Sequence, residues 1–276
     1  MKDKLLSVII TAYNAESTIE RCVASVFNGT PCELAERLEI IVVDDASVDK
    51  TADKLDAFTD KIKLVRLDRN CGCIAKTRNA GLKYANGKYI TYLDSDDWYE
   101  KGAVNKIFSY ISEYSPDIIR FGYTNVYPGG ERKLSEINPR KLEFISGEAM
   151  KLKIYPQVIS GIGLNSVCLA VFKRELTSHR FSEKFFTAED AAFSIEAYSG
   201  ADNVLLIPDV LYCYYRSGSG LTGSAIGIIQ KYRYNFMLVP LMLRQLPKWG
   251  MDTFAWRFRT IMRPLRITFD KLKRIR

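Results

Sequence analysis

The sequence predicts an α/β fold: a mostly parallel central sheet with flanking helices, followed by a basic helical extension. Two observations support this prediction. Short apolar runs alternate with segments of helical periodicity through the first 125 residues, and this alternation is typical of βαβ units. Acidic and aromatic residues directly follow several of the apolar runs, at the place where ligands of parallel sheets bind, outside the carboxyl ends of the strands.

The elements of this sheet can be followed along the chain. A continuous apolar run at residues 5–12 predicts a first strand that is buried on both faces. The segment from Ser17 to Glu20 has the form of a capping box and predicts the start of a helix. Further strands are predicted at residues 39–43, 62–67, 88–93 and 117–123, and further helices at residues 51–58, 76–85 and 101–114.

Polar residues gather where three of these strands end. They are Thr11, Tyr13 and Asn14 for the first strand, Asp44 and Asp45 for the second, and Asp94, Asp96 and Asp97 for the fourth. Carboxylates packed this closely repel one another and tend to bind a cation. Mg²⁺ and Mn²⁺ prefer oxygen ligands, and Mg²⁺ is usually held by one or two carboxylates plus substrate phosphates. The strand ends therefore predict a metal–diphosphate site, with a solvated acidic turn as the alternative.

Charge is distributed unevenly along the 276 residues. Residues 223–276 carry 12 of the 40 basic and 2 of the 32 acidic residues, a net charge of +10, which leaves −2 for residues 1–222. The six cysteines are scattered and there is one histidine, which disfavours a zinc site and a disulfide framework. No apolar run approaches the roughly 18 to 20 residues of a membrane-spanning helix, and we expect a cytoplasmic location.

The basic tail has the pattern of an amphipathic helix with a break or kink at Pro264. Its apolar positions recur at steps of three and four: Phe254, Phe258, Ile261, Leu265, Phe269 and Leu272. Such a helix can lie on an anionic membrane surface, as a peripheral protein does on the inner face of the membrane. Packing on the body or self-association through residues 223–276 explains the same pattern, and both interpretations stay open.

Several segments resemble one known family. SVIITAYNAESTIERCVASV, EIIVVDDASVDKT, NCGCIAKTRNAGL and YITYLDSDDW closely resemble the N-terminal half of family 2 glycosyltransferases of the GT-A fold. FFTAEDAAFSIEAY and YCYYRSGSGLT resemble that family's Glu-Asp and Tyr-Tyr-Arg segments. The resemblance implies a Rossmann-like GT-A domain at residues 1–222, with a nucleotide-sugar-binding half (1–125) and an acceptor and catalytic-base half (126–222). Residues 223–276 follow as the extension.

The resemblance also implies an activity. It predicts an inverting transferase that uses Mn²⁺ or Mg²⁺ and moves a hexosyl or N-acetylhexosaminyl group from a nucleotide-diphosphate sugar, a UDP-sugar by family habit. The acceptor would be a hydroxyl group of a glycan, glycolipid or glycoprotein, in the synthesis of cell-surface polysaccharide or glycoconjugate.

Roles for individual residues follow from the same resemblance. It implies that Tyr13 stacks on the base and that Asp45 hydrogen-bonds to the edge of the base. Asp96 is expected to ligate the metal that bridges the diphosphate, and Asp94 to reach the ribose or the metal. Asp190 is expected to be the catalytic base, with Glu189 beside it. The other residues of the implied nucleotide site are Thr11, Asn14, Asp44, Arg78, Asn79, Ser95 and Arg216.

Some observations leave alternatives open. Asn70 and Arg78 are eight steps apart, one more than is usual in the family, which predicts a reshaped loop. Each acid also fits a helix cap or a helix N-terminus. The basic tail suits a nucleic-acid-binding protein, but we expect no nucleic-acid partner, because the acidic strand ends would then have no purpose. A sugar nucleotidyltransferase is a further alternative, although a glycine-rich phosphate loop is missing after the first strand.

Overall fold

The computed structural model describes residues 3–161, 163–185, 188–217 and 228–273. The strands are β1 (Leu6–Ala12), β2 (Leu38–Asp44), β3 (Lys63–Arg66), β4 (Tyr89–Asp94), β5 (Trp98–Tyr99), β6 (Ile118–Val126), β7 (Arg132–Leu134), β8 (Glu143–Ser146), β9 (Ala170–Lys173) and β10 (Asn203–Tyr215). The helices are α1 (Ile19–Phe27), α2 (Cys32–Ala35), α3 (Thr51–Leu55), α4 (Ile74–Leu82), α5 (Ala103–Tyr114), α6 (Tyr155–Ser160), α7 (Glu189–Gly200), α8 (Ile228–Met237), α9 (Val239–Gln245) and α10 (Phe254–Lys273).

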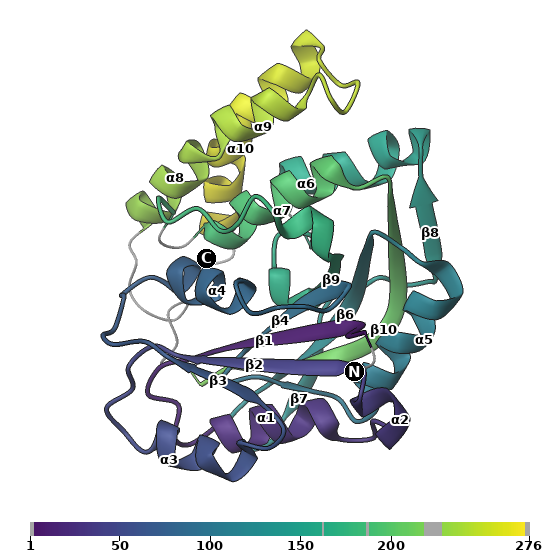
Figure 1. Ribbon diagram of the computed structural model, residues 1–276. Coiled ribbons are helices and arrows are strands. Elements are labelled where there is room, and N and C mark those ends of the chain that lie inside the picture. The colour runs from purple at the N-terminus through teal and green to yellow at the C-terminus, as the bar shows by residue number, and fades with distance from the viewer. Residues whose placement is uncertain (1–2, 162, 186–187, 218–227, 274–276) are drawn as a thin grey trace.

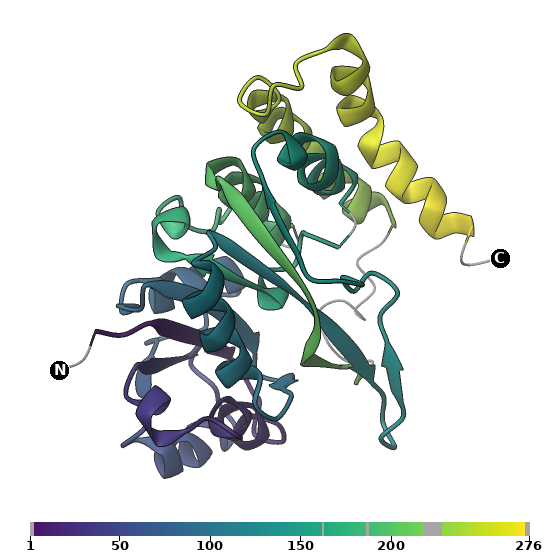
Figure 2. The ribbon, with the colours of Figure 1, turned by 90° about the vertical axis from the view of Figure 1, so that its right-hand side faces the viewer.

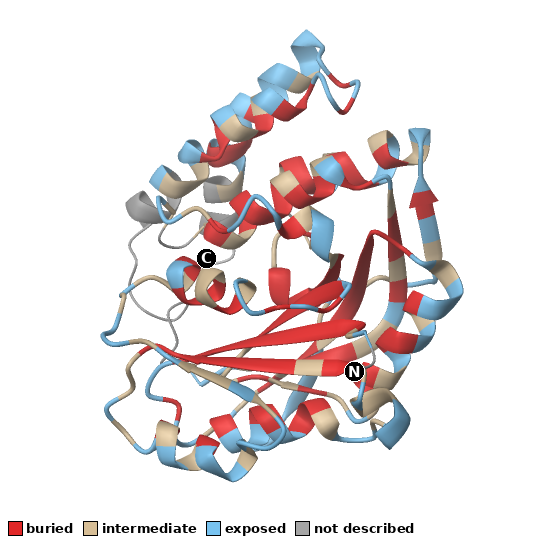
Figure 3. Cartoon of the chain, viewed as in Figure 1, coloured by how far each residue is buried: buried red, intermediate tan, exposed pale blue. Residues whose placement is uncertain are grey.

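These strands join into one twisted sheet, which confirms the predicted α/β class. Its order is β3-β2-β1-β4-β9-β6-β10-β5, with β7 beside β6 and β8 beside β10 (Figure 1). The view in Figure 2 shows the twist of the sheet and the C-terminal helices beyond its second half. Helices lie on both faces, and the central strands are buried (Figure 3). All five strands predicted from the sequence form, and each predicted helix forms at or near its predicted place.

The parallel part of the sheet brings three strand ends together. β1 lies between β2 and β4 and is parallel to both; Ala12 pairs with Asp44, and Thr11 pairs with Asp94. Every residue of β1 is buried, which explains why its sequence is apolar without alternation. The segments that follow β1, β2 and β4 therefore start from one edge of the sheet, as predicted.

The second half of the sheet is partly antiparallel. β9 lies between β4 and β6 and runs antiparallel to both. β10 is parallel to β6 but antiparallel to β5 and β8. Parallel order is thus confined to β3-β2-β1-β4 and to the pair of β6 and β10, so the sheet as a whole is mixed. β9 has only 4 residues, too few to reveal a period in the sequence.

The capping box predicted at Ser17 and Glu20 does not form. Thr18 precedes α1, and its hydroxyl donates to Ala15 O (3.4 Å) without capping the helix. The Glu20 carboxylate accepts instead from Lys54 Nζ, at 2.5 Å. Because α1 has no side-chain cap, packing of its apolar face must stabilise it. That face consists of Ile19, Cys22, Val23 and Val26, all buried.

Helix α4 approaches the sheet closely at Gly81. A Cβ atom there would lie 2.5 Å from Ile9 Cγ2 and 3.2 Å from Val43 Cγ2. We expect Gly81→Ala to lower the free energy of unfolding by roughly 1–3 kcal/mol, measured by urea denaturation, because overpacking outweighs the gain of about 1 kcal/mol in helix propensity. In an Ile9→Ala background the substitution should cost less, since the clashing methyl group is gone. Equal costs in both backgrounds would contradict the close approach.

The C-terminal helices pack on the body near α6 and α7. Leu238, Met242 and Leu246 are fully buried, and the Trp249 ring stacks on Tyr155 with 4.7 Å between centroids. This part of the extension therefore shares the core of the body. The predicted boundary at residues 222–223 lies outside the described residues. Within the described chain, no helix combines the length and the apolar character needed to cross a bilayer.

Candidate functional site

The ends of β1 and β2 form the first part of the site. The Asp45 N–H donates to Ala12 O at 2.9 Å, which holds the two chain segments side by side where the strands end. Tyr13 follows directly, and 49% of its surface is exposed. An aromatic ring that is exposed at a strand end can stack on a planar ligand. Thr11, one step before Ala12, is buried beneath this edge.

Asn14 and Asp44 fix the turns beside Tyr13. Asn14 has a left-handed φ of +48°, which asparagine tolerates better than most residues. Its side-chain Oδ1 accepts from the Val48 N–H at 3.0 Å. Asp44 Oδ1 accepts from the Ser47 N–H at 3.1 Å and from the Ser47 hydroxyl at 2.5 Å. Both residues therefore lie at the predicted edge, where they hold the loop that follows β2.

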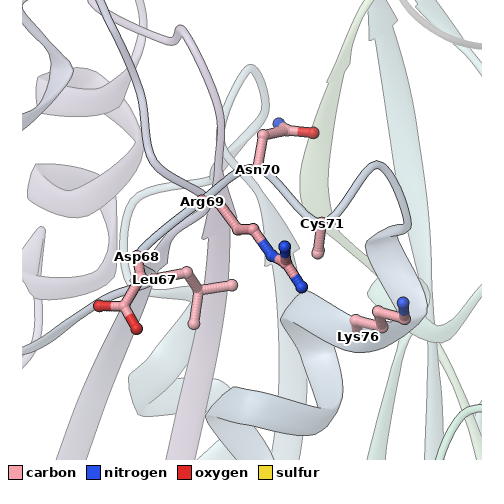
Figure 4. A pocket seen from close by; sticks show the side chains of 6 residues that line it. All are labelled: Leu67, Asp68, Arg69, Asn70, Cys71 and Lys76. Atoms are coloured by element: carbon pink, nitrogen blue, oxygen red, sulfur yellow. The ribbon is translucent and has the colours of Figure 1, made fainter.

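A pocket of about 530 Å³ lies at the segment that follows β3 (Figure 4). Asp45 Oδ1 accepts from the Cys71 N–H at 2.9 Å, and the Asp45 carbonyl accepts from Asn70 Nδ2 at 3.4 Å. Gly72 turns the loop with a φ of +59°, and its N–H donates to Asn70 Oδ1 at 2.8 Å. The pocket is lined by Leu67, Asp68, Arg69, Asn70, Cys71 and Lys76.

This pocket is absent from the predictions made from the sequence. Arg69 and Lys76 flank the loop for which the longer spacing between Asn70 and Arg78 predicts a changed shape. Both side chains line the pocket in Figure 4. The two basic residues beside an acidic strand end were the signal that could have indicated it.

Three carboxylates follow β4 and differ in burial. Asp94 and Asp96 are partly exposed, whereas Asp97 is buried. Burial, and next the charge of Asp94, raise the pKa of Asp96 to about 6. Ser95 lies between the two exposed acids and is partly exposed as well. A cation beside Asp94 and Asp96 would relieve the repulsion between them.

The chemistry of these donors fits a hard divalent cation. Asp94 Oδ1 accepts from Arg78 at 3.1 Å, and carboxylate oxygens of Asp94 and Asp96 are the ligand type that Mn²⁺ and Mg²⁺ prefer. Among the described residues no group of three or more His, Cys, Asp or Glu side chains could hold a metal. The protein would then contribute one or two carboxylates and a nucleotide diphosphate the other oxygens, which is the usual mode for Mg²⁺.

Asp97 has a structural role that its sequence context does not reveal. Its Oδ2 accepts from the Tyr212 hydroxyl at 2.5 Å, and its Oδ1 accepts from the Tyr215 N–H at 2.7 Å. Burial, and next the charges of Asp96 and Asp94, raise the pKa of Asp97 to about 8. Asp97 therefore ties the end of β10 to the acidic loop.

Arg78 connects this acidic loop to a second pair of acids. Its side chain is 2% exposed. Nη2 lies 3.1 Å from Asp94 Oδ1, and Nη1 lies 3.2 Å from Glu189 Oε1 and also donates to Asp190 Oδ1. Burial alone would lower the pKa of Arg78, but the charges of Asp190 and Asp94 raise it well above its usual value. One side chain of α4 thus bridges the end of β4 and the start of α7.

Glu189 and Asp190 occupy the first turn of α7. Burial, and next the charge of Asp190, raise the pKa of Glu189 to about 8. Burial also raises the pKa of Asp190, although the Arg78 charge opposes this rise. Asp190 Oδ2 accepts from the Val167 N–H at 3.4 Å. A carboxylate with a raised pKa is a better proton acceptor, which suits a general base.

Two predicted nucleotide-binding residues have other partners. Asn79 donates from Nδ2 to Phe181 O at 2.9 Å, and its Oδ1 accepts from the Phe181 N–H at 2.8 Å. Both polar atoms of the Asn79 amide thus contact the Phe181 backbone, and a role for Asn79 in the nucleotide pocket stays a prediction. Arg216 donates from Nε to Asn125 Oδ1 at 2.8 Å and packs over the Tyr214 ring. The loop that follows Arg216 lies outside the described residues.

Comparison with known proteins finds a matching family and relatives that are similar in sequence. The family model of Glycosyl transferase family 2 matches residues 7–181. The poly(ribitol-phosphate) beta-N-acetylglucosaminyltransferase TarS of Staphylococcus aureus is 26% identical over 225 residues, which are 78% of this chain and 36% of TarS. WfgD of Escherichia coli, a UDP-Glc:alpha-D-GlcNAc-diphosphoundecaprenol beta-1,3-glucosyltransferase, is 32% identical over 191 residues, 69% of this chain and 68% of WfgD. The chain thus spans about a third of the length of TarS.

Solved structures share the fold. Residues 1–349 of TarS in complex with UDP-GlcNAc match with a TM-score of 0.75 at 22% identity, over 95% of this chain and 71% of that one. The mannosyltransferase PcManGT from Pyrobaculum calidifontis, in complex with GDP-Man and Mn²⁺, matches with a TM-score of 0.58 at 16% identity, over 96% of this chain and 75% of that one. These likenesses confirm the predicted GT-A fold.

Proposed function

The chain belongs to glycosyl transferase family 2, and from this premise we propose that it is a metal-dependent, inverting glycosyltransferase. It moves a sugar from a nucleoside-diphosphate sugar to a hydroxyl group of a glycan acceptor. Family membership favours sugar transfer over a sugar nucleotidyltransferase. A protein that binds nucleic acid through its basic tail would leave the acidic site without a purpose.

The observation that carries this proposal is that Arg78 links two groups of acidic residues. On one side Asp94 and Asp96 lie at the strand ends near Tyr13, where a nucleotide diphosphate and its cation would bind. On the other side Asp190 contacts the same guanidinium group. An inverting transfer needs the cation-binding acids and the catalytic base close together. The base acts on the acceptor while the diphosphate leaves on the opposite face of the sugar.

Individual residues of the chain have separate roles in this reaction. Tyr13 stacks on the base, and Asp45 and the pocket beside it orient the base edge. Asp190 takes the proton of the acceptor hydroxyl as that oxygen forms a bond to the anomeric carbon, and the bond from that carbon to the diphosphate oxygen breaks with its electron pair. Asp94 and Asp96 would hold the divalent cation, which when bound neutralises the charge on the leaving diphosphate. Glu189 contacts Arg78 and helps to hold its guanidinium group beside Asp190, the catalytic base.

Relatives suggest the classes of donor and acceptor. TarS was solved with UDP and with UDP-GlcNAc, and the name of WfgD gives UDP-Glc as its donor. We therefore propose a UDP-sugar donor, with glucose or N-acetylglucosamine as the first sugars to test. TarS and WfgD are named for a poly(ribitol-phosphate) and a diphosphoundecaprenol-linked sugar. We infer an acceptor in the synthesis of cell-surface polysaccharide or glycoconjugate.

The six free cysteines support the proposed cytoplasmic location.

A donor screen tests this function. UDP-, GDP- and dTDP-sugars are added to the protein with and without Mn²⁺, and thermal unfolding is measured. We expect a UDP-sugar with Mn²⁺ to raise the melting temperature, because a ligand at 100 times its Kd stabilises the folded state by about 2.7 kcal/mol. No shift with any nucleotide-sugar, or equal shifts with all of them, would contradict the proposal.

Asp96→Ala should remove the part of this stabilisation that depends on Mn²⁺, because one carboxylate ligand is lost. The measurement is the same melting assay with the UDP-sugar that gives the largest shift. Asp60→Ala serves as the matched control: Asp60 is exposed just before β3, where no strand ends. If Asp96→Ala keeps the full Mn²⁺-dependent shift, Asp96 is not a ligand and the metal site is misplaced.

A further inference from the structure

Helix α10 packs Trp256 and Pro264 on the body together with two polar residues, and it leaves a row of apolar residues exposed. On its inner side Thr260 is 0% exposed and Arg263 is 4% exposed. Its outer side carries four apolar residues at helical spacing, here called the α10 stripe: Phe254 (86% exposed), Phe258 (54%), Ile261 (46%) and Leu265 (39%). A helix whose apolar residues all served to pack on a core would leave no such row exposed.

Contacts on the inner side fix this orientation. Arg263 Nη1 donates to Asn235 Oδ1 of α8 at 3.0 Å. The same guanidinium group lies so near Gly161 that a Cβ atom there would come within 2.7 Å of Nη2. The Thr260 hydroxyl donates to Trp256 O at 2.8 Å. If the helix turned so that the stripe faced inward, Arg263 would lose its hydrogen bond to Asn235 and its place beside Gly161. The stripe therefore faces outward in the folded protein.

Basic residues border the α10 stripe on both sides. Arg257 lies on one flank of the helix, and Arg259 and Arg266 lie on the other; all three are exposed. The rings of Phe254 and Phe258 stack with 6.3 Å between centroids, so the stripe begins with a continuous aromatic surface. Arginine side chains can cover apolar surface with their stems while the charged ends reach outward.

We propose that the α10 stripe inserts into the headgroup region of an anionic membrane, with the exposed side chains of Arg259 and Arg266 beside anionic lipid headgroups. The combination of an outward apolar stripe and basic flanks is that of a helix that lies in the plane of the membrane interface. The net charge of +10 over residues 223–276 adds attraction to such a surface. This inference goes beyond the proposed transfer reaction and does not depend on it.

Charge complementarity favours a membrane over a second copy of this chain. Two copies joined through their α10 stripes would bring together two tails that each carry a net charge of +10 over residues 223–276. Asp252, the acid that precedes the helix, already pairs with Arg257 through hydrogen bonds of 2.5 and 2.9 Å. Like charges at a desolvated interface oppose association, whereas anionic headgroups would neutralise them.

Vesicle flotation of the full chain tests this inference. The protein is mixed with vesicles of phosphatidylcholine alone or with added phosphatidylglycerol. The stripe variant combines Phe254→Ser, Phe258→Ser, Ile261→Ser and Leu265→Ser. Leu134→Ser with Leu152→Ser is the matched control, because these leucines are 69% and 78% exposed on other elements. We expect binding to the anionic vesicles that weakens with salt and is lost by at least about tenfold in the stripe variant alone.

Each other outcome overturns the inference. It fails if the wild type does not float with anionic vesicles, if the stripe variant floats as well as the control, or if neutral vesicles bind equally. A wild-type dimer that the stripe variant converts to a monomer, measured by light scattering, would assign the stripe to a second copy. Should the fourfold variant not fold by circular dichroism, Phe254→Ser alone, at the most exposed position of the stripe, must lower flotation measurably.

Discussion

Replacing Asp190 with asparagine should lower kcat by roughly 10²- to 10⁴-fold, the usual contribution of a general base, while the affinity for the donor stays nearly unchanged. The amide is similar in size to the carboxylate but cannot accept the acceptor's proton. Asp190 is placed by Arg78 and by the Val167 N–H. Donor affinity is measured by calorimetry with UDP and Mn²⁺, and kcat with the sugar identified in the donor screen.

Glu189→Gln is the matched control for this substitution. It removes the ionisable group of the other acid that contacts the same guanidinium group but leaves the proposed base in place. We expect it to lower kcat far less than Asp190→Asn does. If Glu189→Gln loses as much activity, or if Asp190→Asn turns over normally, the base has been assigned to the wrong carboxylate.

Replacing Arg78 with leucine should destabilise the fold by about 3–5 kcal/mol, the usual cost of removing one partner from a buried ion pair. Asp94, Glu189 and Asp190 would then face one another without their shared counter-charge. Urea denaturation with and without the substitution measures the change. Arg78→Lys should cost less, because it keeps the charge but not the fork that reaches several carboxylates.

The loss in Arg78→Leu should also depend on pH. Arg78 opposes the rise in the pKa of Glu189, so without Arg78 this pKa lies higher still. Above the wild-type pKa of about 8 the folded variant keeps a proton that the folded wild type loses, so the stability of the variant falls more steeply as pH rises. The variant should therefore be closer to the wild type at pH 7 than at pH 9. A loss of equal size at both values would show that the Glu189 charge is not what Arg78 balances.

Sequence patterns were sufficient for the parts of the site that lie on regular strands. The buried runs before Tyr13, Asp45 and Asp94 are long enough to show as strands, and parallel pairing then places the residues after them at one edge. No knowledge of side-chain direction was needed there, because topology alone brings these residues together.

Contacts between distant segments were beyond the reach of sequence patterns. Arg78 and Asp190 are 112 positions apart in the chain, and nothing in either segment indicates that they touch. The same holds for Asp97, whose partner Tyr212 lies on a strand that is 115 positions away. The contact of Asn79 with Phe181 was hidden for the same reason, since Phe181 comes from a segment without periodicity.

In the tail, the sequence pattern predicts the helix correctly but leaves open which face of the helix meets the protein. Spacing alone predicts an amphipathic helix, and α10 forms with Pro264 within it. Only the burial of Thr260 and Arg263 shows that the apolar side faces outward. A sequence gives the angle between two faces of a helix but not which of them meets the protein.

Anomalous scattering from Mn²⁺ in crystals of the protein grown with UDP tests the central claim most directly. We expect one strong manganese peak within coordination distance of a carboxylate oxygen of Asp96 or Asp94, beside the UDP diphosphate, with the uracil ring against Tyr13 and near Asp45. A UDP molecule bound elsewhere, or bound at these residues with no manganese beside either aspartate at saturating Mn²⁺, would contradict the account.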